Sequence, residues 1–308
     1  MALLRPNALR PGSTVAVVAP ASLPSSERID AGLHVLEGLG YRARVTPQER
    51  SPSRHYLAGT DTFRAQVLTE AILSDEVDAV WCLRGGYGSI RTLDSMNPEV
   101  LASVAKPIIG FSDVTVLLLA MYKMGCIGLH GPVVTQLPNL DAQSLAHLQA
   151  TLQGTATHVP LLETRTILKE GDATGPLVGG NLSIISSLIG TPWQPVLAGC
   201  ILFLEDVGEP AYRLDRALTQ LRLSGALDGV AGALVGDFSD MPHADHHAFD
   251  DVLQEFTGWI DGPVVRGLPC GHGARNVVLP IGASVRLDTR RDRLVLTEPA
   301  LRRSEGVS

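Results

Sequence analysis

The sequence has few aromatic residues, few cysteines and no long apolar run. Aromatic residues make up 5% of the 308 residues, and no two of the four cysteines form a C-x-x-C pair. A zinc knuckle and a thioredoxin-type redox motif are therefore excluded, and we expect reduced, buried thiols. No apolar run reaches the roughly 18 residues needed to span a bilayer. Because the apolar run Val15–Val18 is too short for a signal peptide, we expect an opening β-strand and a cytoplasmic protein.

The sequence also has fewer basic residues than acidic ones. The chain has 25 Lys and Arg residues against 32 Asp and Glu residues, a formal net charge of −7. This balance argues against binding to nucleic acids or acidic membranes. Hydrophobic residues make up 45% of the chain, which is typical of a folded globular protein. The length suggests two domains of about 150 residues each.

Short apolar runs alternate with amphipathic segments in the first half of the chain. This pattern predicts strands over 14–19, 42–46, 77–83 and 107–110, and helices over 26–39, 61–73 and 113–124. Strands that alternate with helices indicate right-handed crossovers and a parallel sheet covered on both faces. Ligands bind beyond the carboxyl ends of such strands, where a Gly-rich turn and a Phe-Ser-Asp segment fall.

The second half has a different pattern. After a helix predicted over 144–153 the chain becomes polar, and isolated strands are then predicted over 200–205, 232–236, 284–288 and 293–297. We therefore expect an α/β domain over 1–150, a linker over 151–175 and a smaller, β-rich α+β domain over 176–308.

Ser112 is a candidate nucleophile. It lies where the strand predicted over 107–110 turns sharply into a helix, as in a nucleophile elbow, in which the next backbone N–H helps to form an oxyanion hole. The G-x-S-x-G form of this motif would need glycine at Val114. An ordinary helix N-cap formed by Ser112 or Asp113 is the alternative interpretation.

A nucleophilic serine needs a base, and His272 is the best candidate. The flanking Gly271 and Gly273 allow the backbone to bend and leave the imidazole free to point into a cleft. A histidine of an ordinary loop is the alternative. His130 is a second candidate base, but it follows the helix that Ser112 begins, so we expect it to line or support the site.

Glu205 is the candidate carboxylate that would orient the base, since it ends an apolar strand where an unpaired acid is costly. A salt bridge from Glu205 to Arg213 or Arg216 is the alternative. The neighbouring acids Asp206 and Glu209 are equally compatible with the spacing.

The Gly-rich turn Arg84-Gly85-Gly86-Tyr87-Gly88 has two interpretations. It could cradle a phosphate, although it lacks the spacings of the P-loop and of the dinucleotide-binding motif. Alternatively, its backbone N–H groups could face a developing oxyanion beside Ser112.

A histidine cluster, His243-Ala244-Asp245-His246-His247, has the residue types of a metal site. It lies in a polar stretch and lacks the paired spacing of helical metal ligands. We therefore expect a solvated loop or the start of a helix, and no metal.

These segments together resemble the LD-carboxypeptidase family of serine peptidases, which includes murein tetrapeptide carboxypeptidases and microcin-C immunity peptidases. The resemblance covers nearly the whole chain. It rests on Val18–Ser22, Arg84–Gly88, Gly110–Asp113, His130–Pro132, Gly179–Ser183, Leu202–Asp206 and Gly271–Gly273.

The resemblance implies a catalytic triad of Ser112, His272 and Glu205, with oxyanion donors from the backbone of Asp113 and of Gly86. It further implies a Rossmann-like (flavodoxin-like) amino-terminal domain, a smaller β-rich carboxy-terminal domain, a homodimer, and neither metal nor cofactor.

The activity implied by the resemblance is hydrolysis of the L,D-peptide bond that holds the terminal D-alanine of murein tetrapeptides, in cell-wall recycling. Arg84 and Gly85 are then candidates for binding the free carboxylate of the substrate. An immunity peptidase that cleaves aminoacyl-adenylate amides is the alternative within the family, and it would need an aromatic surface for the purine. A non-catalytic α/β protein that binds a small ligand is the alternative of a different class.

Overall fold

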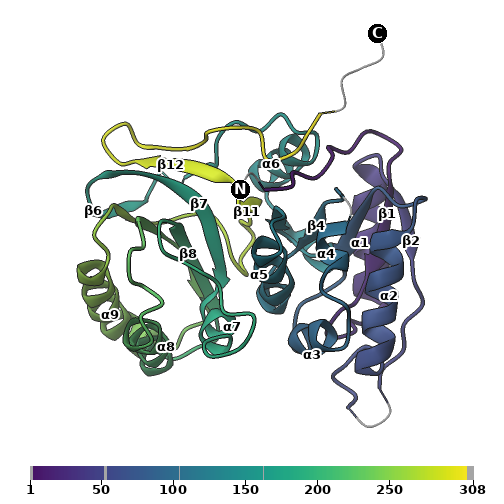
Figure 1. The fold of residues 1–308 in the computed structure, drawn as a ribbon, viewed down its shortest axis with the longest axis horizontal. Coiled ribbons are helices and arrows are strands. Elements are labelled where there is room, and N and C mark those ends of the chain that lie inside the picture. Colours follow the sequence, from purple (N-terminus) through teal and green to yellow (C-terminus); the bar gives the residue numbers. More distant parts are fainter. Residues whose placement is uncertain (1–2, 52–53, 104, 162, 304–308) are drawn as a thin grey trace.

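The strand β1 (Thr14–Val18) explains why the first half folds around a parallel sheet. Its side chains alternate between two apolar clusters: Val15 and Val17 belong to one, and Ala16 and Val18 to the other. A strand buried on both faces reads as a continuous apolar run, as this one does. The computed structural model describes residues 3–51, 54–103, 105–161 and 163–303 and arranges them around two sheets that lie side by side (Figure 1).

The first sheet has the strand order β11-β5-β4-β3-β1-β2. The strands β1 to β5 are parallel, and β11 pairs with β5 in the antiparallel direction. The order β2-β1-β3-β4-β5 is that of a flavodoxin-like sheet. In such a sheet the direction in which successive strands are added reverses between β1 and β3. The other strands are β2 (Arg42–Val45), β3 (Ala79–Cys82), β4 (Ile108–Gly110), β5 (Gly128–His130) and β11 (Leu279–Ile281).

Helices cover both faces of this sheet, as predicted. Apolar residues of α1 (Ser26–Gly38), the 3-10 helix η2 (Val134–Asn139) and α6 (Ala142–Leu152) pack into the cluster on one face. The other face is covered by α2 (Asp61–Leu73), α3 (Ser89–Asp94), α4 (Val100–Ser103) and α5 (Thr115–Lys123).

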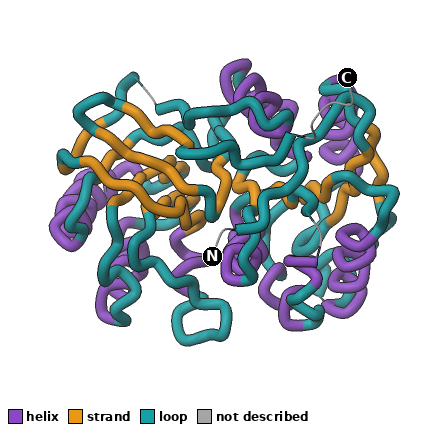
Figure 2. Tube along the Cα trace, turned by 45° about the horizontal axis from the view of Figure 1, so that its top comes forward, coloured by secondary structure: helices purple, strands orange, loops and turns teal. Residues whose placement is uncertain are grey.

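The second half is rich in strands, and its mixed sheet has the order β13-β12-β7-β8-β9-β10-β6. Its four central strands, β7 to β10, are parallel, while β12, β13 and β6 are antiparallel to their neighbours. Figure 2 shows the strands of the two sheets as separate groups with helices around them. The strands are β6 (Thr166–Lys169), β7 (Asp172–Asn181), β8 (Ile201–Val207), β9 (Gly232–Ser239), β10 (Val264–Arg266), β12 (Ser284–Asp288) and β13 (Arg293–Leu296), and the helices are α7 (Leu182–Ser187), α8 (Ala211–Leu223), η3 (His243–Asp245) and α9 (His246–Trp259).

Residues 151–175, which the sequence predicts as a linker, contain β6 and the start of β7, and both strands belong to the second sheet. The chain also returns to the first half near its end, because β11 completes the first sheet. The backbone N–H of Ala8 donates to the carbonyl of Arg302, which lies next to the amino-terminal segment.

The helix α5 joins the two halves. Every residue from Thr115 to Met121 is buried, because the helix is covered by the first sheet on one side and by β7 on the other. A helix that is apolar all round must be enclosed in this way. The hydroxyl oxygen of Thr115 accepts a hydrogen bond of 3.2 Å from the backbone N–H of Asn181, at the end of β7. The amino-terminal end of α5, just after Ser112, therefore lies at the junction of the two halves (Figure 1).

Candidate active site

Ser112 occupies a strained turn between β4 and α5. Its φ of +62° lies in the left-handed region, which a serine adopts at a cost of roughly 1–2 kcal/mol. Phe111 before it is extended, and the 3-10 helix η1 (Ser112–Val114) follows. A Cβ atom on Gly110 would lie 2.9 Å from Cγ1 of Val114, so the turn requires glycine at that position. This is the geometry of a nucleophile elbow. The close packing of this elbow requires glycine at position 110, while position 114 holds Val114.

The helix N-cap interpretation of this segment is wrong. The carboxylate of Asp113 accepts a hydrogen bond of 2.7 Å from the backbone N–H of Ser89, the first residue of α3. Burial raises the pKa of Asp113, and this hydrogen bond opposes that effect. Asp113 thus fastens the turn after β4 to the helix that follows the Gly-rich loop.

His272 and Glu205 form a hydrogen-bonded pair. The Nδ1 atom of His272 lies 2.9 Å from Oε2 of Glu205, and the glutamate side chain is 0% exposed while that of His272 is 20% exposed. Burial raises the pKa of Glu205, and the hydrogen bond with His272 opposes the shift. The predicted alternative, a salt bridge of Glu205 with an arginine of α8, is wrong, because Arg213 pairs with Glu209 instead.

The neighbouring acids do not contact His272 in this way. Asp206 accepts hydrogen bonds from the side chains of Asn181 and Ser183, at 2.9 and 2.7 Å, and so holds the junction of β7 and α7. Glu209 is occupied by Arg213 at 3.2 Å. Of the three acids that the spacing left open, Glu205 is the one that is hydrogen-bonded to the imidazole of His272.

His130 lies behind the site. Its side chain is buried against Phe111 and Phe203, with ring centroids 5.9 and 5.0 Å away. Burial lowers its pKa to about 3, and the nearby His272 adds to the shift. His130 is therefore a neutral core residue that supports Phe111, and Phe111 in turn packs against the ring of His272 at 4.7 Å.

The Gly-rich loop lies directly against the elbow. A Cβ atom on Gly85 would be 2.9 Å from Cβ and 3.1 Å from Oγ of Ser112, and 3.2 Å from the backbone nitrogen of Asp113. Gly86 has a φ of +99°, and a Cβ atom there would lie 2.3 Å from Oγ of Ser22, on the loop after β1. Glycines are thus needed at both positions for the loop to approach Ser112.

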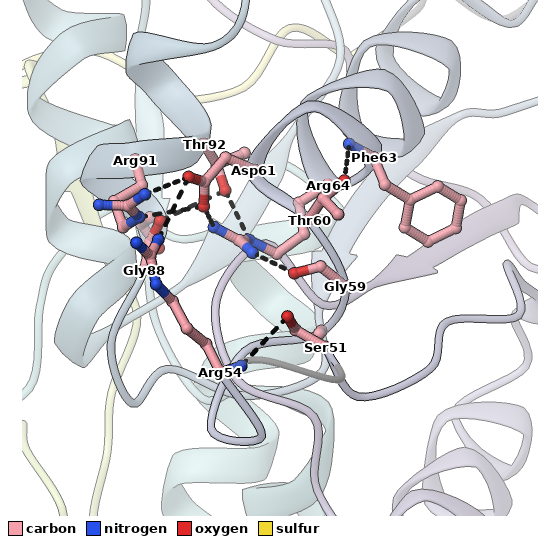
Figure 3. Close-up of polar contacts among 12 residues, drawn as sticks. Ser51, Arg54, Gly59, Thr60, Asp61, Phe63, Arg64, Gly88, Arg91 and Thr92 are labelled. Carbon is pink, nitrogen blue, oxygen red and sulfur yellow. Dashed lines mark hydrogen bonds and ion pairs between the residues drawn. The ribbon is translucent and has the colours of Figure 1, made fainter.

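An ion cluster around the buried Arg64 holds the segments next to this loop (Figure 3). The guanidinium of Arg64 is 0% exposed and donates to the carbonyls of Pro20 and Gly59 and to Asp61. Asp61 also pairs with Arg91 of α3. Because these contacts join the loop after β1 to the start of α2 and to α3, they fix the helix that follows Arg84–Gly88 and the loop that Gly86 approaches.

Ser112 and His272 line the same cavity, which has a volume of about 560 Å³. Arg84, Gly85 and Gly86 also line it, so the structure brings these predicted site residues together with the serine and the histidine. The cavity lies at the carboxyl ends of the parallel strands, as predicted. The sequence analysis missed four polar residues of its wall, Arg28, Thr135, Gln136 and Asn139.

Gln136 braces the loop that carries His272. Its side-chain amide donates to the carbonyls of Gly271 and Gly273, at 3.3 and 3.1 Å, and its side-chain oxygen accepts from Asn276 at 2.8 Å. Gln136 lies on η2 in the first half, whereas the His272 loop belongs to the second. No local motif marks this contact, since it joins residues 135 and 137 positions apart.

The histidine cluster forms η3 and the first turn of α9, and its three imidazoles are exposed, which confirms the predicted helix start. Among the residues that the structure describes, no group of three or more His, Cys, Asp or Glu side chains could hold a metal ion. Within the same described part of the chain, every helix is too short or too polar to cross a membrane.

A serine in a strained elbow, a histidine paired with a buried carboxylate and a glycine loop in one cavity are the arrangement of a serine hydrolase. Comparison with known proteins identifies the family. Residues 15–131 match the LD-carboxypeptidase N-terminal domain, and residues 174–287 match the LD-carboxypeptidase C-terminal domain. The chain belongs to the LD-carboxypeptidase family and is a serine peptidase.

Relatives in this family align over almost the whole chain. The murein tetrapeptide carboxypeptidase of Pseudomonas aeruginosa is 35% identical over 90% of this chain and 94% of its own length. The crystal structure of the muramoyltetrapeptide carboxypeptidase from Oxalobacter formigenes superposes with a TM-score of 0.82 at 30% identity, covering 92% of this chain and 100% of the other. The structure of MccF in complex with glutamyl sulfamoyl guanosine has a TM-score of 0.88 at 21% identity, covering 97% and 100%, and shares the fold.

Proposed function

We propose that Ser112, His272 and Glu205 are the catalytic triad of this peptidase. The observation that carries the proposal is that His272, which lines the same cavity as the strained Ser112, is paired with the buried Glu205. The carboxylate accepts from the Nδ1–H group, so it fixes the imidazole tautomer in which Nε2 is free to take a proton. A buried acid paired with a histidine of a cavity wall favours a catalyst over an α/β protein that only binds a ligand.

The reaction is acyl transfer to the serine. Nε2 of His272 takes the hydroxyl proton of Ser112 while Oγ attacks the scissile carbonyl carbon. The imidazolium, stabilised by Glu205, then protonates the leaving amine. In the second half of the reaction His272 takes a proton from water, which attacks the acyl-enzyme, and the proton returns to Oγ of Ser112.

The backbone N–H groups of Asp113 and Gly86 are the proposed oxyanion donors. The close approach of the Gly-rich loop to Ser112 supports this role, as does the attachment of Asp113 to Ser89. One well-placed donor is worth on the order of 3 kcal/mol in the transition state. The fixed geometry of the loop therefore contributes to catalysis in addition to the triad.

The proposed substrate is a murein tetrapeptide, which loses its terminal D-alanine. The names of the relatives from Pseudomonas aeruginosa and Oxalobacter formigenes support this choice. Arg84 and Gly85 would bind the free carboxylate of the substrate, because they lie in the cavity beside Ser112. Peptidoglycan recycling in the cytoplasm and a homodimeric assembly belong to the same proposal.

A second candidate is cleavage of aminoacyl-adenylate amides, which the likeness to MccF suggests. A purine needs an aromatic surface on which to stack. Among the described residues of the cavity wall, the aromatic side chain besides His272 is Phe111, which is 4% exposed and packed against that histidine. The peptide substrate therefore fits the cavity better.

Mass spectrometry of the products tests the proposal. The purified protein is incubated separately with a murein tetrapeptide and with an adenylated aminoacyl compound, beside the variants Ser112→Ala and Ser187→Ala. Ser187 is an exposed serine of α7 and serves as the control. We expect the wild type and Ser187→Ala to release alanine from the tetrapeptide, and Ser112→Ala to be slower by at least about 10⁴-fold. Turnover of the adenylated compound alone would contradict the peptide substrate, and an active Ser112→Ala would contradict the triad.

A further inference from the structure

The loop that carries His272 separates two cavities. Gly273 and Ala274 line the active-site cavity, and they also line a second cavity of about 490 Å³ whose other side is formed by β9 and α9. In this loop His272 and Gly273 are half-buried and Ala274 is exposed. A segment with open space on both sides has few packing contacts, so its position depends on the hydrogen bonds that reach its backbone.

A β-bulge in β9 lies opposite Glu205. The register between β8 and β9 shifts there, so that two residues of β9, Gly236 and Asp237, face the single residue Glu205. The regular pairs on either side are Leu204 with Val235 and Asp206 with Phe238. A Cβ atom on Gly236 would lie 2.6 Å from the carbonyl oxygen of Cys270, so the bulge requires glycine at that position. A bulge changes the direction of the side chain of its extra residue, which here is Asp237.

The bulge brings Asp237 against the loop of His272. The backbone N–H of Asp237 donates to the carbonyl of Cys270 at 2.9 Å. A Cβ atom on Gly271 would lie 2.7 Å from Cβ of Asp237, and one on Gly273 would lie 3.1 Å from its Oδ2 atom. The side chain of Asp237 therefore contacts both of the glycines that flank His272.

The carboxylate of Asp237 acts on the backbone of the loop. Burial raises the pKa of Asp237, and the nearby Asp240 adds to this shift. The backbone N–H of Gly273 and the imidazole of His272 oppose the shift, because both stabilise the negative charge. Since Nδ1 of the imidazole is already bonded to Glu205, the N–H of Gly273 is the group that the carboxylate of Asp237 holds.

Resting on the proposed function, we propose that Asp237 is a positioning residue, which holds the loop of His272 through the backbone N–H of Gly273. Gln136 holds two carbonyls of the same loop from the first half of the chain, and Asp237 holds the N–H group from the second half. With both contacts in place the loop cannot move into either cavity. The imidazole therefore stays paired with Glu205.

The first measurement compares two substitutions of Asp237. Asp237→Ala removes the acceptor of the N–H group, whereas Asp237→Asn keeps an acceptor oxygen on a side chain of the same shape. We expect Asp237→Ala to reduce kcat for alanine release by about tenfold with a smaller change in KM. Asp237→Asn should stay close to the wild type.

Asp288→Ala is the matched control. The carboxylate of Asp288 also accepts backbone N–H groups, those of Arg290 and Arg291, at 3.1 Å each. It lies at the far end of the second sheet, because Asp288 pairs with the start of β7 whereas Glu205 pairs with the end of β7. Asp288→Ala should lower the unfolding free energy in urea and leave kcat unchanged.

The second measurement needs no substrate. It follows the NMR resonance of the proton on Nδ1 of His272, which is assigned by its loss in His272→Ala. Opening of the pair with Glu205 exposes this proton to exchange with water. We therefore expect the resonance to broaden in Asp237→Ala and to remain sharp in the wild type, Asp237→Asn and Asp288→Ala.

The outcomes separate the role of Asp237 from the proposed function. Wild-type kcat or a sharp resonance in Asp237→Ala would overturn that role, whatever the loss of stability in urea. An Asp237→Asn variant as slow as Asp237→Ala would also overturn it, since the charge and not the contact would then matter. If the wild type releases no alanine, the proposed reaction is contradicted, and the resonance in Asp237→Ala alone decides whether Asp237 holds the loop.

Discussion

The Nδ1 atom of His272 lies 2.9 Å from a carboxylate oxygen of Glu205, a residue 67 positions earlier in the chain. Glu205 belongs to β8, whose side chains are buried up to Asp206, while His272 lies on the loop between β10 and β11. The second sheet thus supplies Glu205, the first supplies Ser112, and the loop that connects the two sheets supplies His272. Because α5 is enclosed between the two sheets, packing of the halves brings Ser112 and His272 to one cavity, with Glu205 buried beside the histidine.

Glu205→Gln should separate activity from stability. The amide can no longer stabilise the imidazolium or select its tautomer, so we expect kcat to fall by about 10⁴-fold. Burial raises the pKa of Glu205, so the native state holds this proton more tightly than the unfolded chain does. The wild type therefore loses stability as the pH rises from the ordinary pKa of glutamate through the raised value. Relative to the wild type, the glutamine variant should gain unfolding free energy over that range.

Urea denaturation of both proteins between pH 4 and pH 8 measures the difference in stability, and alanine release measures activity. Glu209→Gln is the control, since it removes a partly exposed carboxylate on the same segment that pairs with Arg213. An active Glu205→Gln would disprove the role of Glu205 in the triad, and a stability difference that shrinks with rising pH would disprove the direction of its pKa shift.

Gly85→Ala should impair catalysis with little effect on folding. The new methyl group would lie 2.9 Å from Cβ and 3.1 Å from Oγ of Ser112, so either the Gly-rich loop or the elbow must move. Displacement of about 1 Å at a catalytic group can cost about 100-fold in rate, and we expect a loss of that size in kcat.

Gly38→Ala is the matched control for Gly85→Ala. A Cβ atom on Gly38 meets nothing within 4 Å, and Gly38 is the last residue of α1. Alanine there should raise the unfolding free energy by up to about 1 kcal/mol and leave alanine release unchanged. Wild-type activity of Gly85→Ala would show that the loop does not hold the oxyanion donors in place.

The sequence predicts the parts of the fold and site that depend on local patterns. The alternating core of β1, the turn at Ser112 and the glycines around His272 are each visible within a few residues. The helix α8 was missed, although Leu214, Leu218 and Leu221 recur on one face at helical spacing and are buried.

Other features depend on contacts between distant segments. The strand β11 has three residues, one of them Pro280, and it exists because it pairs with β5 about half the chain away. Gln136 contacts the His272 loop across the junction of the two halves. Arg28 reaches the cavity because β1 and β3 are neighbours. Strand pairing and domain packing decide such contacts, and no local spacing encodes them.

Gln136→Ala should weaken catalysis through the loop of His272. The variant leaves the carbonyls of Gly271 and Gly273 without their donor, which should lower the unfolding free energy by about 1–3 kcal/mol. A looser His272 should reduce kcat by about tenfold with a smaller change in KM. Gln220→Ala is the control, because the amide of Gln220 also bonds at both ends, to Ser186 on α7. If Gln136→Ala lost stability but kept its kcat, the brace would be structural only.

His130→Phe should make the protein less sensitive to acid. Burial lowers the pKa of His130 to about 3, so between about pH 6.5 and pH 3 this ring is neutral in the native state while the unfolded chain is protonated. Since the ordinary histidine pKa is about 6.5, the stability that comes from neutral His130 is complete above that value and is lost as the pH falls from about 6.5 to about 3. At about pH 4 this loss amounts to about 3 kcal/mol.

Phenylalanine has a similar ring, which can keep the edge contacts with Phe111 and Phe203 and has no proton to gain. We therefore expect the unfolding free energy to fall less between pH 7 and pH 4 in His130→Phe than in the wild type. Urea denaturation at both pH values measures the unfolding free energy, and the same substitution at the exposed His34, His34→Phe, is the control. Equal acid sensitivity of His130→Phe and the wild type would show that His130 is protonated or exposed in the folded protein.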